Sequence, residues 1–364
     1  MAKRVGVDKW LFGVVLLLVL FGLVTVFSAS AVMAQSTLGS PYPYVMKQAK
    51  WALLGLLVMV WLMRVDYRRY NNPRVVFPAV AVTTLMLIAV FATRDSHNTH
   101  RWFRFGDLFT FQPSELAKPV LVLFLAYFLQ TRIHQMDDVK GTILRAVAVP
   151  LVFTALILKE PDLGTGLVCM AVTALMLYLA GAKAKYFAVG AALASPVLYY
   201  MLFFVKFRRD RMFAFINPEA DPRGTGFHIL QSLIAVGTGG LRGLGLMEGR
   251  QKLFYLPEVQ TDFIFANICE ELGLIGALLV VGLFVALGYR GLRAAFLSTD
   301  PFARFLAFGI TTAILIQAFF NMSVVLALLP TKGIPLPFIS SGGTSIFITL
   351  ASMGVLLNIT REID

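Results

Sequence analysis

The sequence is poor in the residues that build a soluble enzyme or a disulfide-linked domain. Only 14% of its 364 residues are charged, whereas soluble proteins average about a quarter. Its two cysteines, Cys169 and Cys269, lie inside apolar stretches, so they give neither a metal-binding spacing nor a disulfide framework. The sequence has no nucleotide-binding glycine motif, heptad pattern or internal repeat. These absences argue against a soluble catalytic domain.

Apolar residues fill most of the chain instead. Hydrophobic side chains make up 58% of the sequence, and the net charge is +12. In a soluble domain such a charge would suggest nucleic acid, but here Lys and Arg cluster at the ends of apolar runs, where they suit membrane topology and lipid headgroups. We therefore expect an all-α polytopic membrane protein that binds no nucleic acid.

Ten apolar runs are long enough to cross a membrane as helices. The first follows Met1–Asp8 without a convincing cleavage site, so we interpret it as a retained span rather than a removed signal peptide. We expect a single membrane domain over residues 1–364, with spans near 11–33, 48–63, 75–92, 113–130, 142–158, 163–181, 185–205, 263–289, 303–329 and 340–359.

The distribution of Lys and Arg indicates the orientation. They are concentrated in the connections on the side of both termini, which predicts that the termini are cytoplasmic. Residues 206–262, between the seventh and eighth spans, then form one large extracytoplasmic loop. Because irregular backbone is not tolerated in lipid, this loop of prolines, glycines and charges is the part of the chain with room for chemistry.

The loop ends at Asp262, directly before an apolar run. An aspartate at this position can be a helix N-cap. It can also be an ionisable group at the membrane edge, facing basic residues such as Arg211 and Arg242 that could hold a phosphorylated lipid. Asp162, at the start of the sixth span, allows the same two interpretations. Together the two aspartates could share a substrate proton or a divalent cation, Mg²⁺ or Mn²⁺.

Charged residues also occur inside the predicted spans. Glu115 and Lys118 are three residues apart and so share one helix face, where they either pair with each other or serve a function in the bundle interior. Glu270 and Glu271 are adjacent and cannot point the same way. We expect one of them to meet a cation such as Lys118 and the other to lie near a polar cavity.

Two outer connections contribute further candidates. Arg101 and Trp102 lie in an aromatic-rich connection that is typical of the membrane interface, although Arg101 could also hold phosphate. Lys332 lies in a stretch with three prolines in eight residues, which cannot be continuous helix. We expect this stretch to be a re-entrant or outer-edge turn.

Five motifs together resemble the SEDS family of bacterial membrane proteins. They occur in order along nearly the whole chain, at Gln112–Lys118, Pro161–Thr165, Leu256–Ala266, Glu270–Gly273 and Leu336–Gly343. Residues 229–235, 250–258 and 329–333 look more like the family's division proteins than its elongation proteins. The sequence departs from the family's usual residues at three positions, where it has Glu160 for Gln, Gln260 for His and Ser341 for Tyr.

This resemblance implies a peptidoglycan glycosyltransferase that polymerises lipid II at the outer face of the bacterial cytoplasmic membrane during cell division. Undecaprenyl pyrophosphate would leave with inversion at the anomeric carbon. In this hypothesis Asp262 is the catalytic acidic group, acting as general base or through a divalent cation, and positioned cations stabilise the leaving pyrophosphate. The expected substrate-binding residues are Arg101, Trp102, Glu115, Lys118, Asp162, Arg211, Arg242 and Lys332.

The resemblance also implies partners and leaves alternatives open. The partners are the growing lipid-linked glycan strand, an FtsI-like class B penicillin-binding protein and other division proteins. The alternatives are the elongation polymerase of the same family and a lipid II flippase. The intramembrane charges suit a flippase, but the paired broken segments of inverted-repeat transporters are not evident. A scaffold without activity would leave the buried charges without a purpose.

Overall fold

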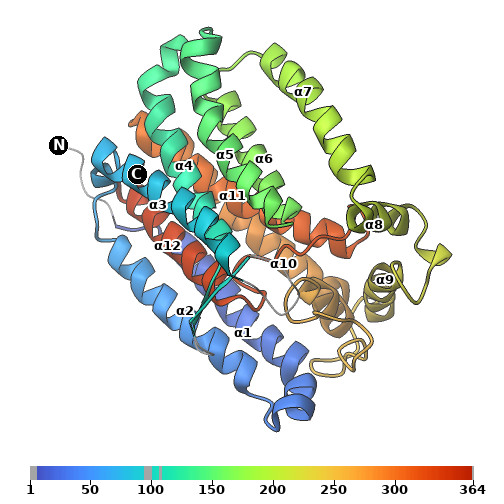
Figure 1. Ribbon diagram of the computed structural model, residues 1–364. Helices are drawn as coiled ribbons and strands as arrows, with labels where there is room; N and C mark the ends of the chain where they lie inside the picture. The colour runs from blue at the N-terminus through green and yellow to red at the C-terminus, as the bar shows by residue number, and fades with distance from the viewer. Residues whose placement is uncertain (1–5, 94–100, 106–108, 363–364) are drawn as a thin grey trace.

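The computed structural model describes residues 6–93, 101–105 and 109–362. Helices dominate it, and one short antiparallel hairpin pairs β1 (Phe103–Phe105) with β2 (Phe109–Phe111). The α-helices (Figure 1) are α1 (Lys9–Leu38), α2 (Pro43–Leu62), α3 (Pro73–Ala89), α4 (Pro113–Arg132), α5 (Leu144–Lys159), α6 (Leu163–Leu179), α7 (Ala184–Phe203), α8 (Lys206–Ile216), α9 (Phe227–Gly239), α10 (Ile264–Leu297), α11 (Pro301–Val325) and α12 (Gly343–Ile359).

The ten predicted spans correspond to ten of these helices, α1 to α7 and α10 to α12. Within the described ranges, nine of them are long and apolar enough to cross a membrane. The tenth, α6, is apolar but has only 17 residues. The prediction of an all-α polytopic membrane protein is confirmed.

Proline and short polar side chains determine where several helices begin. Proline occupies the first turn of α2, α3, α4 and α11, where its missing N–H leaves no bond unmade. The Asp162 carboxylate accepts a hydrogen bond from the amide of Thr165 in α6, so its N-cap interpretation is confirmed. At α10 the N-cap position belongs to Phe263, and no side chain caps the helix. The N-cap interpretation of Asp262 is therefore wrong.

The bundle packs around α11 and α12. Helix α11 contacts α4, α6 and α10, and α12 packs along α2. Helix α7 has no buried residue and lies at the edge of the bundle, where it contacts α8 (Figure 1).

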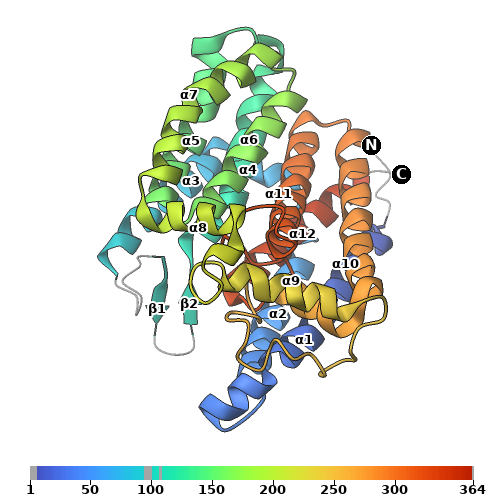
Figure 2. The same ribbon diagram turned by 90° about the vertical axis from the view of Figure 1, so that its right-hand side faces the viewer.

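The two ends of the described chain lie side by side (Figure 2). The amide of Asp8 donates to Thr360 Oγ1 at 3.2 Å, and the Asp8 carboxylate pairs with Arg290 Nη2 at 2.6 Å. Arg290 lies in the last third of α10, whereas Asp262 lies two residues before its start. Asp262 and the termini are therefore at opposite ends of this helix, as the predicted topology requires.

The segment 206–262 is more ordered than its composition suggests. It contains α8 and α9, joined and followed by turns. Helix α9 packs against α10 (Figure 2). Residues 330–342, with their three prolines, contain no helix, as predicted.

The expectation that one of the adjacent glutamates of α10 meets a cation is confirmed, but that cation is not Lys118. Lys118 Nζ lies 3.0 Å from both carboxylate oxygens of Glu115, and it donates to Gln317 Oε1 on α11. Glu271 pairs instead with Lys252, 2.5 Å away in the segment 206–262. The reason is that Glu270 and Glu271 face α1 and the segment 206–262, whereas Lys118 faces Gln317 of α11.

Candidate active site

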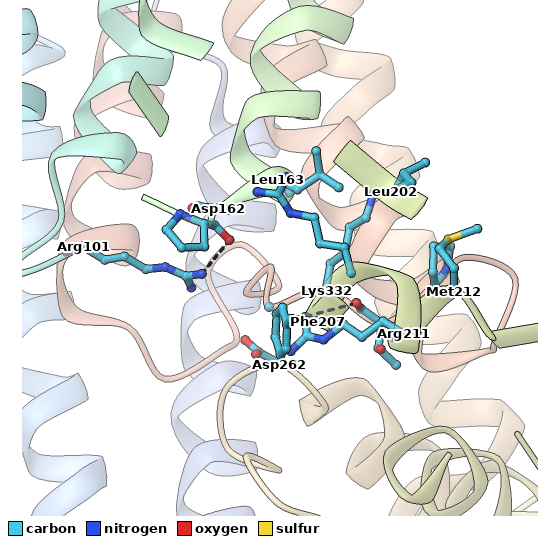
Figure 3. Close-up of a pocket in the computed structure, with 15 residues that line it drawn as sticks. Arg101, Asp162, Leu163, Leu202, Phe207, Arg211, Met212, Asp262 and Lys332 are labelled. Atoms are coloured by element: carbon cyan, nitrogen blue, oxygen red, sulfur yellow. Dashed lines mark hydrogen bonds between the residues drawn. The ribbon is translucent and has the colours of Figure 1, made fainter. Parts of the chain in front are cut away.

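Asp262 lies where two cavities meet. The first, about 160 Å³ in volume, is lined by residues from Arg101, α6, α8 and the irregular segment 330–333. The second, about 440 Å³, extends toward α9 and Glu258. Figure 3 shows Arg101, Asp162, Arg211, Lys332 and Asp262 around the first cavity. The two cavities share Phe207, Arg211, Asp262, Thr331, Lys332 and Gly333.

The backbone around Asp262 is held from the opposite side by α11 and the segment 330–342. Asn321 Nδ2 donates to the carbonyl of Asp262 at 2.8 Å, and Ser340 Oγ donates to the carbonyl of Thr261 at 2.6 Å. Gly333 approaches so closely that a Cβ there would lie 2.8 Å from Asp262 Oδ2. This packing fixes where the carboxylate points.

The Asp262 carboxylate itself has no hydrogen bond or ion pair with any residue in the described ranges. Burial and the nearby charge of Glu258 raise its pKa to about 7, and Arg211 opposes this shift. A carboxyl group with a pKa near neutrality can accept and release a proton at physiological pH.

Positive charge gathers around the first cavity. Arg101 donates from Nε and Nη2 to the carbonyls of Glu160 and Pro161, both at 2.7 Å. Arg211 donates to the carbonyl of Thr331 at 3.3 Å, and its guanidinium lies 4.1 Å from the ring centroid of Phe207. Within the described ranges neither guanidinium forms an ion pair with a carboxylate, although the charge of Arg211 acts on Asp262.

Lys332 completes this positive cluster. Burial and the neighbouring Arg208 lower its pKa to about 8. Arg208 also lines the cavity, and burial and Arg101 lower its pKa from its ordinary value. Clustered cations that depress one another's pKa form a site that favours a multivalent anion.

The second cavity has a different chemical character. Carboxylates of Asp210, Asp221 and Glu258 line it together with His228. The His228 ring stacks on Phe263, with centroids 5.8 Å apart, and burial lowers its pKa. Glu258 has a positive φ of 55°, which is uncommon for a residue other than glycine and occurs often at functional sites.

Other predicted site residues lie apart from Asp262 or are already engaged. Asp162 lines the first cavity, but its two oxygens accept from the amide and the hydroxyl of Thr165. Trp102 and Arg242 line neither cavity.

Glu115 and Lys118 also lie outside both cavities, beside a separate one of about 30 Å³. Lys118 contacts Gln317, whose Nε2 donates to the carbonyl of Pro335 at 2.9 Å. The buried pair of Glu115 and Lys118 is therefore connected through Gln317 to the segment 330–342.

The described residues do not fit a protein-made metal site. No group of three or more His, Cys, Asp or Glu side chains within the described ranges could hold a metal ion. Asp262 and Asp162 line one cavity, but Thr165 occupies both Asp162 oxygens.

Comparison with known proteins gives a family for this arrangement. Residues 8–364 match the family model for the cell cycle proteins FtsW, RodA and SpoVE. The chain belongs to this family.

Relatives and solved structures agree along nearly the whole length. The chain is 42% identical to the probable peptidoglycan glycosyltransferase FtsW of Geobacter metallireducens, covering 94% of this chain and 91% of the relative. It is 37% identical to stage V sporulation protein E of Bacillus subtilis, covering 99% and 98%.

Two solved structures have the same fold. One comes from work on the structural coordination of polymerization and crosslinking by a peptidoglycan synthase complex (TM-score 0.76, 27% identity, 98% and 97% coverage). The other is the rod shape determining protein RodA of Thermus thermophilus (TM-score 0.71, 26% identity, 98% of each chain). The suspected membership of the SEDS family is confirmed.

One departure from the usual residues of this family has a physical explanation. Glu160 is fully buried, and no described residue hydrogen-bonds its carboxyl group. Burial and the charge of Asp162 raise its pKa to about 9. At neutral pH the side chain is therefore an uncharged carboxylic acid, which has nearly the shape of glutamine, the residue that the resemblance leads us to expect there.

Sequence patterns alone miss several residues of the site. Asp210, Asp221 and His228 belong to the second cavity but stand singly in the sequence, without a motif. For Phe207 the signal is its spacing of four residues from the predicted Arg211 on α8, which places the two side chains on one helix face.

Proposed function

We propose that this chain is a peptidoglycan glycosyltransferase of the FtsW type, which polymerises lipid II and releases undecaprenyl pyrophosphate. The observation that carries the proposal is the place of Asp262. Its free carboxylate lies between a cavity lined by Arg101, Arg208, Arg211 and Lys332 and a larger cavity lined by carboxylates and a histidine. The relatives named peptidoglycan glycosyltransferase support this assignment.

The positive cavity suits the donor's pyrophosphate. Arginine and lysine side chains bind phosphate oxygens through charge-assisted hydrogen bonds. As the bond between the anomeric carbon and the pyrophosphate oxygen breaks, negative charge develops on the leaving group, and positioned cations lower the free energy of that transition state. Arg101, Arg211 and Lys332 are the residues that we assign to this role.

The larger cavity suits the acceptor. Its volume of about 440 Å³ falls in the usual range for small-molecule sites, roughly 300 to 1,000 Å³. The GlcNAc 4-hydroxyl oxygen attacks the anomeric carbon of the donor, the pyrophosphate leaves with the bonding electrons, and Asp262 accepts the hydroxyl proton. The new glycosidic bond then has the inverted configuration.

The proposed topology places this reaction at the outer face of the cytoplasmic membrane, with both termini in the cytoplasm. The concentration of Lys and Arg on the side of the termini supports it. We also propose a class B penicillin-binding protein, FtsI-like, and other division proteins as partners. A solved relative from a peptidoglycan synthase complex supports the first of these.

A requirement for a divalent cation stays a prediction. Because the described protein residues do not form a cation site by themselves, no step of the proposed reaction is assigned to Mg²⁺ or Mn²⁺. Polymerisation that stops on EDTA addition and returns with Mg²⁺ or Mn²⁺ would establish the requirement.

Polymerisation of lipid II by the purified protein, mixed with its class B partner, tests the proposal. Wild-type protein should produce glycan strands on a gel, and Asp262→Asn should lose about 100-fold or more of the rate, as expected for removal of a general base.

A matched control is Asp137→Asn, an exposed aspartate paired with Lys183 on the side of the termini, which should polymerise like wild type. Strand synthesis at the wild-type rate by Asp262→Asn would overturn the role of this residue.

A further inference from the structure

Helix α10 is broken at Gly273, and the break is filled by another part of the chain. Gly273 has φ 63° and ψ −160°, outside the helical region. The amides of Leu244 and Gly245 donate to the carbonyls of Glu270 and Glu271, both at 3.0 Å. On the other side of the break, the amides of Leu274 and Ile275 donate to the carbonyls of residues 240 and 241. The segment 240–245 is thus docked backbone to backbone into α10.

The side chains of Glu270 and Glu271, just before the break, bind residues 250–252. Glu270 Oε1 accepts from the amides of Arg250 and Gln251, at 2.8 and 3.2 Å. Glu271 Oε1 lies 2.5 Å from Lys252 Nζ, and Ser28 Oγ of α1 lies 2.7 and 2.6 Å from the two Glu271 oxygens. We call Ser28, Lys252, Glu270 and Glu271 the clasp.

The clasp is buried, which makes its charges hard to explain by stability. Lys252 is 5% exposed, and both glutamates are 1% exposed. A buried ion pair costs much desolvation, and apolar residues of similar volume are often as stable or more stable. What such a pair does provide is one defined geometry, because each charge is satisfied in a single arrangement.

The clasp is connected to Asp262 along the chain. Residues 250–252 lead directly to Glu258 and Asp262, which line the second cavity. The chain is held again after the clasp, where the amide of Ser341 donates to the carbonyl of Gln260 at 2.8 Å. The stretch from residue 250 to Asp262 is therefore fixed by the clasp at one end and by the segment 330–342 at the other.

We propose that the clasp positions Asp262 for catalysis, so that Lys252, Glu270 and Glu271 are positioning residues that do not touch substrate. This inference rests on the proposed glycosyltransferase function. It assigns the intramembrane glutamates of α10 to the geometry of the active site, and not to a path for substrate or protons.

The test removes the charge of Lys252 alone or the charges of both Lys252 and Glu271. Both variants are studied as full-length protein with the class B partner. Lys252→Met alone leaves a buried carboxylate without its cation and should lower the unfolding temperature. The double variant Lys252→Met and Glu271→Gln removes both charges of the ion pair, while Glu270 keeps its backbone hydrogen bonds, and it should unfold near the wild-type temperature. Its kcat for lipid II should still fall about 10- to 100-fold at unchanged KM, because small misplacement of a catalytic group affects the transition state.

The matched control is the pair at the far end of the same helix. Asp8→Asn with Arg290→Met removes an ion pair of similar length and should leave kcat unchanged. A double clasp variant with wild-type stability and wild-type kcat would overturn the proposal. If the double variant does not fold, Lys252→Arg is measured in its place. A lower kcat at unchanged KM would support the positioning role of the clasp. An unchanged kcat would overturn it.

A second readout separates this inference from the proposed function. If wild-type protein makes no glycan, the proposed function fails, and hydrogen exchange of residues 250–262 then decides on the clasp. Faster exchange of these amides in the double clasp variant, with the control pair unaffected, supports a positioning role. Equal exchange overturns it.

Discussion

Asp262 shows how the surroundings of one residue prepare it for proton transfer. Burial opposes its ionisation, Glu258 adds a second negative charge, and Arg211 offsets part of the effect, so that its pKa rises to about 7. Lys332, in the same cavities, has a pKa lowered to about 8. Both groups therefore titrate close to neutrality.

We predict a bell-shaped pH dependence of kcat/KM. Activity should fall as pH drops through about 7, because Asp262 becomes protonated and can no longer accept a proton. It should also fall as pH rises through about 8, because Lys332 loses the charge that binds pyrophosphate. Measured rates of lipid II polymerisation across this range check both limbs.

The charge of Glu258 should set the position of the acidic limb. Glu258→Gln removes a negative charge that disfavours the Asp262 carboxylate, so the pKa of Asp262 should fall and the acidic limb should move to lower pH. Glu219→Gln is the control, since Glu219 is exposed and lines neither cavity. An acidic limb that stays in place in Glu258→Gln would contradict this electrostatic account.

Gly333 leaves space that the Asp262 carboxylate needs. In Gly333→Ala the new methyl would lie 2.8 Å from Asp262 Oδ2, so the carboxylate must move. Since displacements of about 1 Å can cost about 100-fold in rate, we expect a loss of about 10- to 100-fold in kcat. Gly342→Ala is the matched control, because its methyl would meet its nearest neighbour at 3.5 Å, and it should retain most of the activity.

At the scale of the element, the break in α10 depends on one glycine. Gly273→Ala would place a Cβ 2.4 Å from the amide nitrogen of Gly243 and force alanine into a region of φ and ψ that only glycine adopts readily. Backbone strain of this kind costs about 1 to 3 kcal/mol, so the unfolding temperature in detergent should fall. Gly282→Ala, in the regular part of α10 with nothing within 4 Å of the new methyl, should unfold no earlier than wild type.

The elements that could be predicted are those with a local physical signal. Each of the ten spans is an apolar run that lies on one helix, and within the described ranges nine of these helices are long enough to cross a membrane. The three prolines at positions 330, 335 and 337 likewise exclude a continuous helix over this stretch. Helix α8 has no comparable signal, and α9 is apolar but has only 13 residues. In the structure α8 contacts α7, and α9 packs on α10.

The candidate site could be predicted only in part for the same reason. Asp262 stands out because it meets an apolar run, whereas the partner of Glu271 is Lys252, a residue of a separate polar segment. The identity of such partners depends on how distant segments pack. The pairing of Lys118 with Glu115 needed only helix geometry, and it is confirmed.

At the scale of the whole molecule, the buried charges weigh against a translocation path. Lys118 is paired with Glu115, and Lys252 with Glu271. A path for lipid II headgroups or protons needs charges that can change partners, whereas these pairs are enclosed and tied to backbone segments next to Asp262. Their arrangement fits an enzyme with a fixed site at one end of the bundle.

The orientation of the bundle decides on which side of the membrane the reaction occurs. The two native cysteines are 1% and 4% exposed, so they should react little with a membrane-impermeant maleimide. Arg223→Cys lies in an exposed turn of the segment 206–262. Lys140→Cys lies at an exposed position of the helical turn Val139–Ile143, which precedes α5 on the side of the termini. We expect Arg223→Cys to be labelled in intact spheroplasts and Lys140→Cys only after permeabilisation. The reverse pattern would place Asp262 and its cavities in the cytoplasm, where polymerised glycan could not join the cell wall directly.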